Sequence, residues 1–282
     1  MKPVLTRGEA AQHMTINSRS RANVHALRNF AAALSTDSLQ YSGMRKSRNR
    51  QWMQRGMDNA LRLLMPDRCA FCGIGVHGSA WCCRCSELLH RTENPCPRCA
   101  APLAAQQAAG IECGRCQAEP PSFDKAVAAL SYRFPVDTAL KSLKFNGQLF
   151  VVPACAALLH PLLATHFPAA DALVPVPLHW LRHAMRGFNQ ATEICKPVAR
   201  SSGLPMIRSV RRVRSTPFQS GLNAAARRRN LGNAFSLRGD LKCRHPVIVD
   251  DVMTTGETSH QLARALRKAA AESVGVLVVA RA

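Results

Sequence analysis

The sequence of 282 residues has few aromatic residues, few acidic residues and no long apolar run. Aromatic residues make up 5% of the chain and apolar residues 47%, so a core is expected to be aliphatic, as in α/β proteins. The longest apolar stretch, 151–164, is interrupted by Pro153, His160 and Pro161 and falls short of the ~18 residues of a membrane helix. No secretory apolar segment follows the N-terminus. We therefore expect a cytoplasmic protein with no transmembrane segment.

The scarcity of acids leaves a large positive charge. The chain has 38 Lys and Arg against 17 Asp and Glu, a formal net charge of +21. A field of this sign favours polyanions and phosphorylated ligands, but it does not distinguish nucleic acid from a small phosphate ester. The alternative is a surface that is charged for solubility alone.

Residues 1–56 are rich in Ser, Arg, Asn and Gln and hold ten basic residues against Glu9 and Asp37. Such a composition buries little apolar surface, so we expect a disordered basic extension. An organellar transit peptide is a second reading. A third is an overextended start codon, with the natural chain beginning at Met53 or Met57.

Residues 57–120 carry nine of the twelve cysteines, and eight of these nine stand in four Cys-x-x-Cys pairs. Each pair aims two thiolates at one point, and two pairs complete a tetrahedral four-cysteine site. In a reducing compartment such pairs more often hold metal than form disulfides. We expect structural Zn²⁺, one or two ions, with sequential and interleaved pairing both open; an iron–sulfur cluster and redox dithiols are the alternatives. The expected ligands are Cys69, Cys72, Cys82, Cys85, Cys96, Cys99, Cys113 and Cys116.

Residues 121–282 form the second expected domain, in which strand-like and helix-like segments alternate. Strands are expected at 125–132, 171–176, 246–250 and 273–280, and helices at 137–145, 153–164, 181–199 and 257–271. This alternation predicts an α/β fold, a parallel sheet with helices on both faces.

One segment of this domain carries the clearest chemistry. The apolar run 247–249 leads into Asp250 and Asp251, and a loop with Thr254, Thr255, Gly256 and Thr258 leads into a helix. Ligands of parallel sheets bind at the carboxyl ends of strands, and free N–H groups at a helix N-terminus hold phosphate. Two carboxylates beside such a loop suit two ribose hydroxyls. The alternative is an ordinary strand-to-helix turn with a threonine cap.

This pattern resembles the phosphoribosyl pyrophosphate signature of type I phosphoribosyltransferases. The resemblance implies phosphoribosyl pyrophosphate bound with Mg²⁺. Asp250 and Asp251 would bind the ribose, and the phosphate would lie on Thr254, Thr255, Gly256, Glu257 and Thr258.

Two further segments match places where this family contacts pyrophosphate. A loop after a strand, Pro177, Leu178, His179 and Trp180, stands where the family has a pyrophosphate loop, although its residues are bulkier than usual there. The stretch 208–229, with seven arginines and no acid, stands where the family has a mobile loop. Its expected contributors are Arg214, Thr216 and Gln219. A solvated helix face is the alternative for its arginines.

Taken in order, these blocks resemble the ComF family of bacteria. The resemblance rests on the cysteine pairs, on 143–145, 174–190, 214–230 and 233–235, and on 247–258. It implies a type I phosphoribosyltransferase-like fold preceded by a small zinc-ribbon or knuckle module. It also implies a role in natural competence and in the utilisation of external DNA.

Three functions compete at this point. The first is a phosphoribosyltransferase whose acceptor the sequence does not name. The second is a non-catalytic module that binds single-stranded DNA, although the chain has only three Trp and two Tyr for base stacking. The third is an adaptor for proteins of the DNA-uptake machinery.

Overall fold

The computed structural model describes residues 67–178, 184, 186–213 and 234–282. The expected basic extension, 1–56, lies outside these residues. So do His179, Trp180, Arg214, Thr216 and Gln219.

The centre of the fold is a four-stranded parallel sheet in the order β3-β8-β7-β4. Its strands are β3 (Lys125–Ser131), β8 (Gly275–Arg281), β7 (Pro246–Met253) and β4 (Ala172–Pro175). All residues of β8 are buried, as expected for a central strand of a sheet covered on both faces. The predicted parallel sheet is confirmed.

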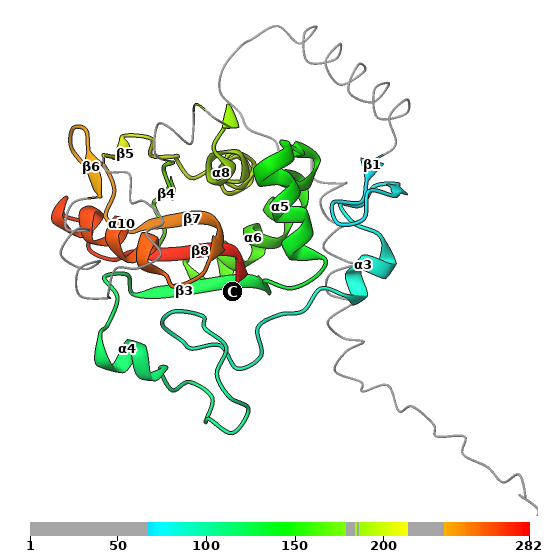
Figure 1. Cartoon of the computed structure of the whole chain (residues 1–282). Coiled ribbons are helices and arrows are strands. Elements are labelled where there is room, and N and C mark those ends of the chain that lie inside the picture. The colour runs from blue at the N-terminus through cyan, green and yellow to red at the C-terminus, as the bar shows by residue number, and fades with distance from the viewer. Residues whose placement is uncertain (1–66, 179–183, 185, 214–233) are drawn as a thin grey trace, which may run out of the picture. The chain divides into compact units, whose positions relative to one another are not determined.

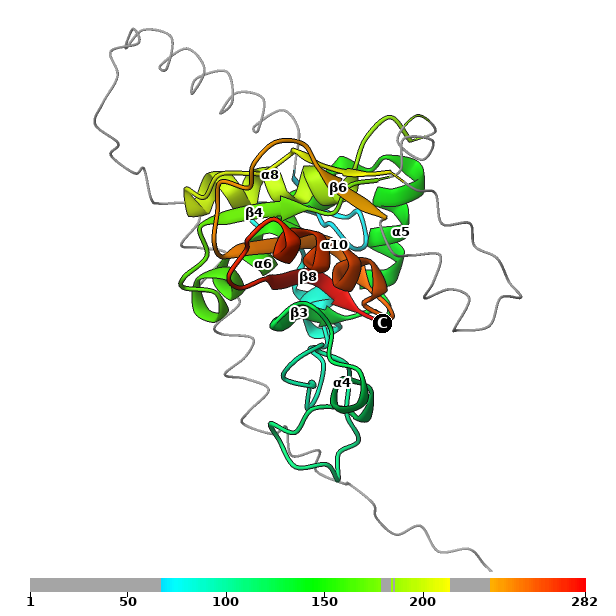
Figure 2. The ribbon, with the colours of Figure 1, turned by 90° about the vertical axis from the view of Figure 1, so that its left-hand side faces the viewer.

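Side chains of successive strand residues enter two separate cores. Val247 and Val249 of β7 pack with helices α5 (Val136–Asn146), α6 (Val152–His166) and α8 (Gln190–Ser202). Ile248 of the same strand packs with helix α10 (Glu257–Lys268) on the opposite face. This alternation places helices on both faces of the sheet, and the elements can be followed in Figures 1 and 2.

Two short strands that the sequence did not suggest complete the α10 side. β5 (Val210–Arg212) and β6 (Phe235–Leu237) form an antiparallel pair, and Val210 and Phe235 pack in the same core as α10. β5 lies near the start of the arginine-rich stretch 208–229, and β6 follows that stretch in the sequence.

The helix expected at 181–199 is wrong in its boundary. Within the described residues, Gly187 has a left-handed φ of 75° and Asn189 has an extended backbone, so 187–189 are not helical. Helix α8 begins at Gln190, and the Asn189 side chain caps it by accepting a hydrogen bond from the Ala191 N–H at 3.1 Å. The correction matters because Asn189 also donates to the Val176 carbonyl at 2.9 Å, which ties the start of α8 to the end of β4.

Residues Leu149–His166, formed by the 3₁₀ turn η1 (Leu149–Val151) and α6, are long and apolar enough to span a membrane. Their mean hydropathy is 1.6, and within the described chain they are the one such segment. The sequence prediction missed this window because it counted the interrupting prolines and histidine instead of averaging. Leu158, Leu159 and Leu163 are buried in the core against the sheet, which is how a core helix of an α/β domain behaves.

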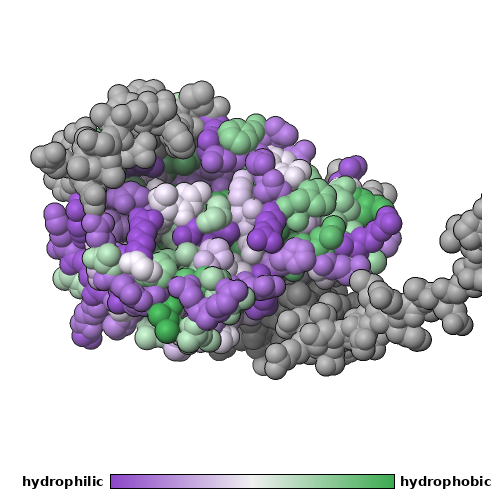
Figure 3. All heavy atoms as spheres, turned by 60° about the horizontal axis from the view of Figure 1, so that its bottom comes forward, coloured by the Kyte–Doolittle hydropathy of each residue, from purple (hydrophilic) through white to green (hydrophobic). Residues whose placement is uncertain are grey.

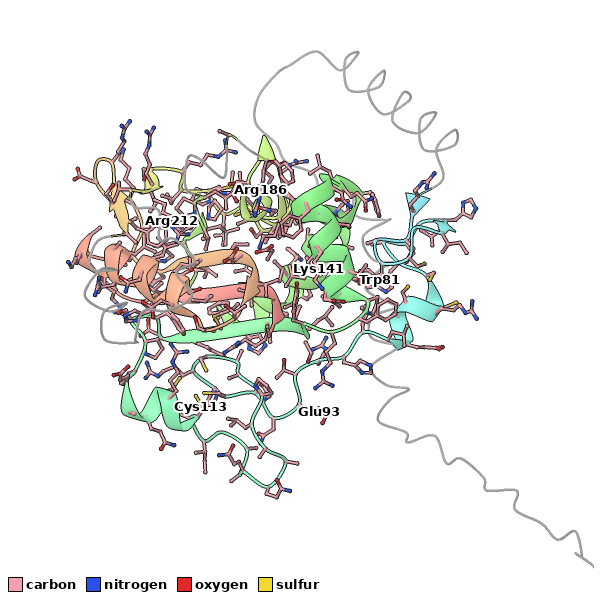
Figure 4. The ribbon with its side chains drawn as sticks, viewed as in Figure 1. Trp81, Glu93, Cys113, Lys141, Arg186 and Arg212 are labelled. Carbon is pink, nitrogen blue, oxygen red and sulfur yellow. The ribbon has the colours of Figure 1, made fainter. Side chains whose placement is uncertain are left out.

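The cysteine region consists of two small modules. The first contains β1 (Asp67–Arg68), β2 (Gly75–Val76) and α3 (Cys83–Glu87), and the second contains α4 (Gly114–Ala118). Figure 4 labels Trp81 in the first and Cys113 in the second. On the face turned forward in Figure 3, the described surface is mostly hydrophilic, with separate smaller apolar patches.

The chain around these modules covers the outer edge of β3. The Ala126 N–H donates to the Arg98 carbonyl at 2.7 Å, and the Ser131 N–H donates to the His90 carbonyl at 2.7 Å. An uncovered strand edge invites pairing with other chains, so this cover protects the sheet. It also fixes the second module beside the strand that precedes α5.

Candidate functional site

The eight paired cysteines form two clusters of four. Cys69, Cys72, Cys82 and Cys85 make the first cluster, and Cys96, Cys99, Cys113 and Cys116 make the second; within each, the sulfur atoms lie within 4.8 Å of one another. The pairing is therefore sequential, which the spacing had left open. Sulfur atoms are 3.7 Å apart between Cys72 and Cys82, and again between Cys99 and Cys113. Zn–S bonds of about 2.3 Å in a tetrahedron put sulfurs about 3.8 Å apart, so both clusters fit Zn²⁺.

The two clusters repeat one another in their hydrogen bonds. The Cys82 N–H donates to Cys69 Sγ at 3.3 Å, and the Cys113 N–H donates to Cys96 Sγ at 3.2 Å. Burial raises the pKa of Cys69 and Cys96, but backbone N–H donors outweigh it and bring each pKa down to about 7. Both first cysteines are thus prepared as thiolate ligands. Four thiolates with no open position give a structural metal site.

The remaining described cysteines lie outside both clusters. Cys83 is exposed and belongs to neither cluster. Burial raises the pKa of Cys155 and of Cys195 to about 12, and that of Cys243 to about 11, so these three are ordinary buried thiols.

The two carboxylates predicted to bind ribose lie within β7, which continues beyond Asp250 to Met253. Asp251 N–H donates to Asp250 Oδ1 at 2.9 Å, and Val252 N–H donates to Asp251 Oδ1 at 2.9 Å, so each carboxylate is held by the next backbone amide. Burial, and then the charge of Asp251, raise the pKa of Asp250 well above its ordinary value; Lys144 acts in the opposite direction. A pair of neighbouring acids, one of them with a raised pKa, near the end of a strand is typical of a binding site.

The loop after β7 is open to an anion. Thr254 and Thr255 are exposed, and Gly256 has a left-handed φ of 77° at the position that caps α10. Gly256 has no side chain with which to cap the helix, and the Glu257 N–H donates a long hydrogen bond to Thr255 Oγ1 at 3.4 Å. Because anions bind at helix N-termini of this kind, the start of α10 is a candidate phosphate site.

Glu257 differs from the other residues of this loop. Its Oε1 accepts a hydrogen bond from Gln261 Nε2 at 2.7 Å, so the carboxylate is turned along the helix. Its backbone N–H, which donates to Thr255 Oγ1 at 3.4 Å, is the part of Glu257 that could donate to a phosphate instead. Thr258, half-buried in the first turn of the helix, follows it.

The described part of the predicted pyrophosphate loop begins beside this strand. Val176 N–H donates to the Val249 carbonyl at 3.0 Å, which continues the β4–β7 ladder to the residue before Pro177. Pro177 and Leu178 then leave the sheet next to the acids of β7. The structure thus brings the start of this loop to the same end of the sheet as Asp250.

Two arginines that the sequence did not single out for this site contact its loop. Arg115 of α4 donates to the Thr255 carbonyl at 2.5 Å. Arg281, at the end of β8, donates to the Met253 carbonyl at 3.0 Å, to the Thr254 carbonyl, and to the Cys99 carbonyl at 3.1 Å. Arg115 was visible only as one of several basic residues in the cysteine region, and nothing in the local sequence marks Arg281.

A cavity of ≈ 440 Å³ lies between the second module and this loop. Cys99, Cys113 and Arg115 line one side, and Thr255 and Gly256 line another. The loop is therefore joined to the module by particular hydrogen bonds across a partly empty space.

Comparison with known proteins agrees with both halves of this geometry. A family model described as a phosphoribosyl transferase domain matches residues 184–282, which include β7, its loop and α10. A model described as a double zinc ribbon domain matches residues 60–117, which include all eight clustered cysteines.

Full-length relatives share both parts. The DNA utilization protein YhgH of Salmonella typhi is 35% identical over 227 residues, covering 78% of this chain and 99% of that protein. YhgH of Escherichia coli K12 is 34% identical over the same shares. Competence protein F of Haemophilus influenzae is 33% identical over 226 residues, 76% of this chain and 97% of that protein. The chain belongs to the ComF family.

In this ComF-family chain, the type I phosphoribosyltransferase fold and the double zinc ribbon are joined by contacts at the loop between β7 and α10 and at the end of β8. Structural zinc is supported by the ribbon match and by the geometry of both cysteine clusters.

Proposed function

We propose that the chain binds phosphoribosyl pyrophosphate with Mg²⁺ at the end of β7, and that this binding serves DNA uptake or utilisation in the cytoplasm. The observation that carries the proposal is the pairing of Asp250 and Asp251 with a helix start whose cap residue, Gly256, makes no side-chain hydrogen bond. The two carboxylates suit a vicinal diol, and the helix start suits a phosphate monoester. A ribose 5-phosphate presents both groups at once.

Different residues would bind different parts of the ligand. Asp250 and Asp251 would accept hydrogen bonds from the ribose hydroxyls, while the loop from Thr254 to Thr258 would hold the 5-phosphate. Mg²⁺ would neutralise the pyrophosphate at 177–180, and Arg214, Thr216 and Gln219 would close over it. If the phosphoribosyl group is transferred, positioning and charge neutralisation would supply the catalysis.

The setting is proposed from the relatives and from the charge. The relatives are called DNA utilization protein and competence protein, and the net charge of +21 suits a protein that works beside a polyanion. Thiolates at two zinc clusters suit a reducing compartment, hence the cytoplasm.

Magnesium should matter for the pyrophosphate and not for the ribose phosphate. We expect calorimetry to show that phosphoribosyl pyrophosphate binds at least about tenfold more tightly with Mg²⁺ than with EDTA, because the metal screens the pyrophosphate charge. Ribose 5-phosphate should bind with nearly the same affinity in both conditions. If neither compound binds the zinc-loaded protein, the proposal is wrong.

A second candidate, binding of single-stranded DNA, is favoured by one observation. Phe145, at the end of α5, is 68% exposed, and Leu149 and Phe150 nearby are exposed as well. The Lys144 Nζ lies 5.6 Å from the centre of the Phe145 ring, and the Arg186 guanidinium, labelled in Figure 4, lies 5.5 Å from it. An open aromatic ring with two cations is the combination on which bases stack and phosphates pair.

We expect Phe145→Ala to weaken binding of a fluorescent oligothymidine by about tenfold, the size of one base–aromatic stack. Anisotropy titrations at several salt concentrations would measure it, since phosphate contacts make the affinity fall with salt. Phe134→Ala is the matched control, because Phe134 is 67% exposed and precedes the same helix. Equal affinities of the two variants would remove this candidate.

A further inference from the structure

Arg281 is the one charged residue among the buried residues of the described chain, with 8% of its surface exposed. A buried cation is costly unless its donors are satisfied. Its guanidinium donates to four backbone oxygens, those of Cys99, Met253, Thr254 and Ala282. The five guanidinium donors form a rigid fork, and this fork joins three segments far apart in sequence.

These partners come from two different parts of the molecule. Cys99 is a ligand residue of the second cysteine cluster, whereas Met253 ends β7 and Thr254 begins the loop that follows it. Arg115, between Cys113 and Cys116 of the same cluster, adds a bond to the Thr255 carbonyl at 2.5 Å. Two arginines thus connect three consecutive carbonyls of the loop to a single cluster.

The first cluster has no comparable place in the described structure. Cys69 and Cys85 share the core of α5, α6 and α8, whereas Cys96, Cys99 and Cys116 share the core of α10, which holds Met253 and Phe123. The two clusters therefore face opposite sides of the sheet. Only the second lies on the side of the phosphate loop.

Because a cavity lies between the second module and the loop, the hydrogen bonds that Arg115 and Arg281 donate to the loop matter for its position. Gly256 lies near Met253 and Phe123, but a space of ≈ 440 Å³ also borders Thr255 and Gly256, so packing holds this loop only in part. The hydrogen bonds from Arg115 and Arg281 therefore contribute to the position of the loop, and Arg281 also donates to the Cys99 carbonyl of a zinc-ligating turn.

We propose that Arg281 is a positioning residue that couples zinc in the second cluster to the ribose-phosphate loop. Ligand at the loop and metal at the cluster then stabilise one another, since coupling between two sites is reciprocal. Zinc in the first cluster is not coupled in this way. The inference rests on the proposed function in taking the β7–α10 loop as the ligand site.

The test compares Arg281→Lys with Arg244→Lys. Lysine keeps the charge of Arg281 but lacks the fork that reaches several carbonyls. Arg244 is a suitable control because its side chain is 70% exposed and pairs with Glu272. Both variants are made in full-length, zinc-loaded protein. Two quantities are measured: the rate of zinc release to a chromogenic chelator, and the affinity for ribose 5-phosphate. The variants Cys85→Ser and Cys116→Ser, each of which removes a ligand of one cluster, show which release phase belongs to which cluster.

We expect Arg281→Lys to speed release of the second zinc, and to weaken ribose 5-phosphate, each by about tenfold, the effect of losing a hydrogen bond to a charged group. Ribose 5-phosphate should slow release of the second zinc in the unmodified protein but not in Arg281→Lys. Release of the first zinc should not change. A variant in which only the affinity or only the release rate changes would overturn the coupling.

The experiment distinguishes an error in the proposed function from an error in the proposed coupling. If the unmodified protein binds no ribose 5-phosphate, that function is wrong, and hydrogen exchange then decides the coupling without a ligand. The His260 N–H, which donates to the Gly256 carbonyl at 2.9 Å, reports on the loop. Faster exchange of this amide in Arg281→Lys supports the coupling, and exchange equal to that of Arg244→Lys refutes it.

Discussion

Replacing Asp250 and Asp251 together by asparagine should weaken phosphoribosyl pyrophosphate by about 100-fold or more and at the same time stabilise the fold. The loss of affinity follows because hydrogen bonds to charged groups contribute about 1.5–3 kcal/mol each, and two carboxylates lose their charge. Binding would be measured by calorimetry with Mg²⁺. Asp240→Asn, a change at an exposed acid of a loop, is the control.

The gain in stability follows from the raised pKa of Asp250. Burial, and then the charge of Asp251, favour the protonated carboxyl in the folded protein, so the folded state holds a proton that the unfolded state releases above about 3.8. Stability from this group is complete below that pH and is lost as pH rises toward the raised pKa. Asparagine cannot ionise, and its Oδ1 can still accept the Asp251 N–H bond.

The pH dependence therefore separates a binding site from a structural pair. The melting temperature of Asp250→Asn should exceed that of the unmodified protein at pH 8, and the difference should shrink toward pH 4. Acidic residues that lower the stability of the fold are expected where function requires them. A lower melting temperature at pH 8, with unchanged ligand affinity, would mean that these acids serve the fold alone.

The part of the site that lies in one continuous segment could be predicted from sequence. The apolar run, the two acids, the loop and the helix follow one another between 247 and 258, and local patterns determine such a unit. The strand nevertheless continues past Asp250 to Met253, because its backbone keeps pairing with β8 through Val252 and Met253. Acidic residues in a strand give no signal that pairing continues.

Long-range contacts could not be predicted in this way. Arg281 is separated from Cys99 by 182 residues, and its neighbours in sequence are apolar or small. The pairing of the cysteines was equally open, because short spacers allow either arrangement. The non-helical residues 187–189, which precede α8, depend on the left-handed backbone of Gly187, and a helical pattern of apolar residues does not reveal such a break.

Sequential pairing of the clusters leads to the last prediction, in which double variants lose different numbers of zinc ions. The unmodified protein should hold two. Cys69→Ser with Cys85→Ser removes two ligands of one cluster and should leave one zinc bound, whereas Cys69→Ser with Cys96→Ser damages both clusters and should leave none. Zinc per chain would be measured by elemental mass spectrometry on purified protein.

The same variants should differ in stability. Structural zinc contributes about 10–16 kcal/mol to the folding of isolated fingers, and even a few kcal/mol lost from a domain of this size lowers the melting temperature by about 10 °C. The second pair of changes should therefore lower it further than the first. Cys83→Ser is the control, since Cys83 is exposed and lies outside both clusters. If the double variant at Cys69 and Cys85 lost both ions while the one at Cys69 and Cys96 kept one, the pairing would be interleaved. The Cys99 carbonyl that Arg281 contacts would then belong to a metal site shared with the first module. The proposal that Arg281 couples only the second zinc to the loop would then be wrong.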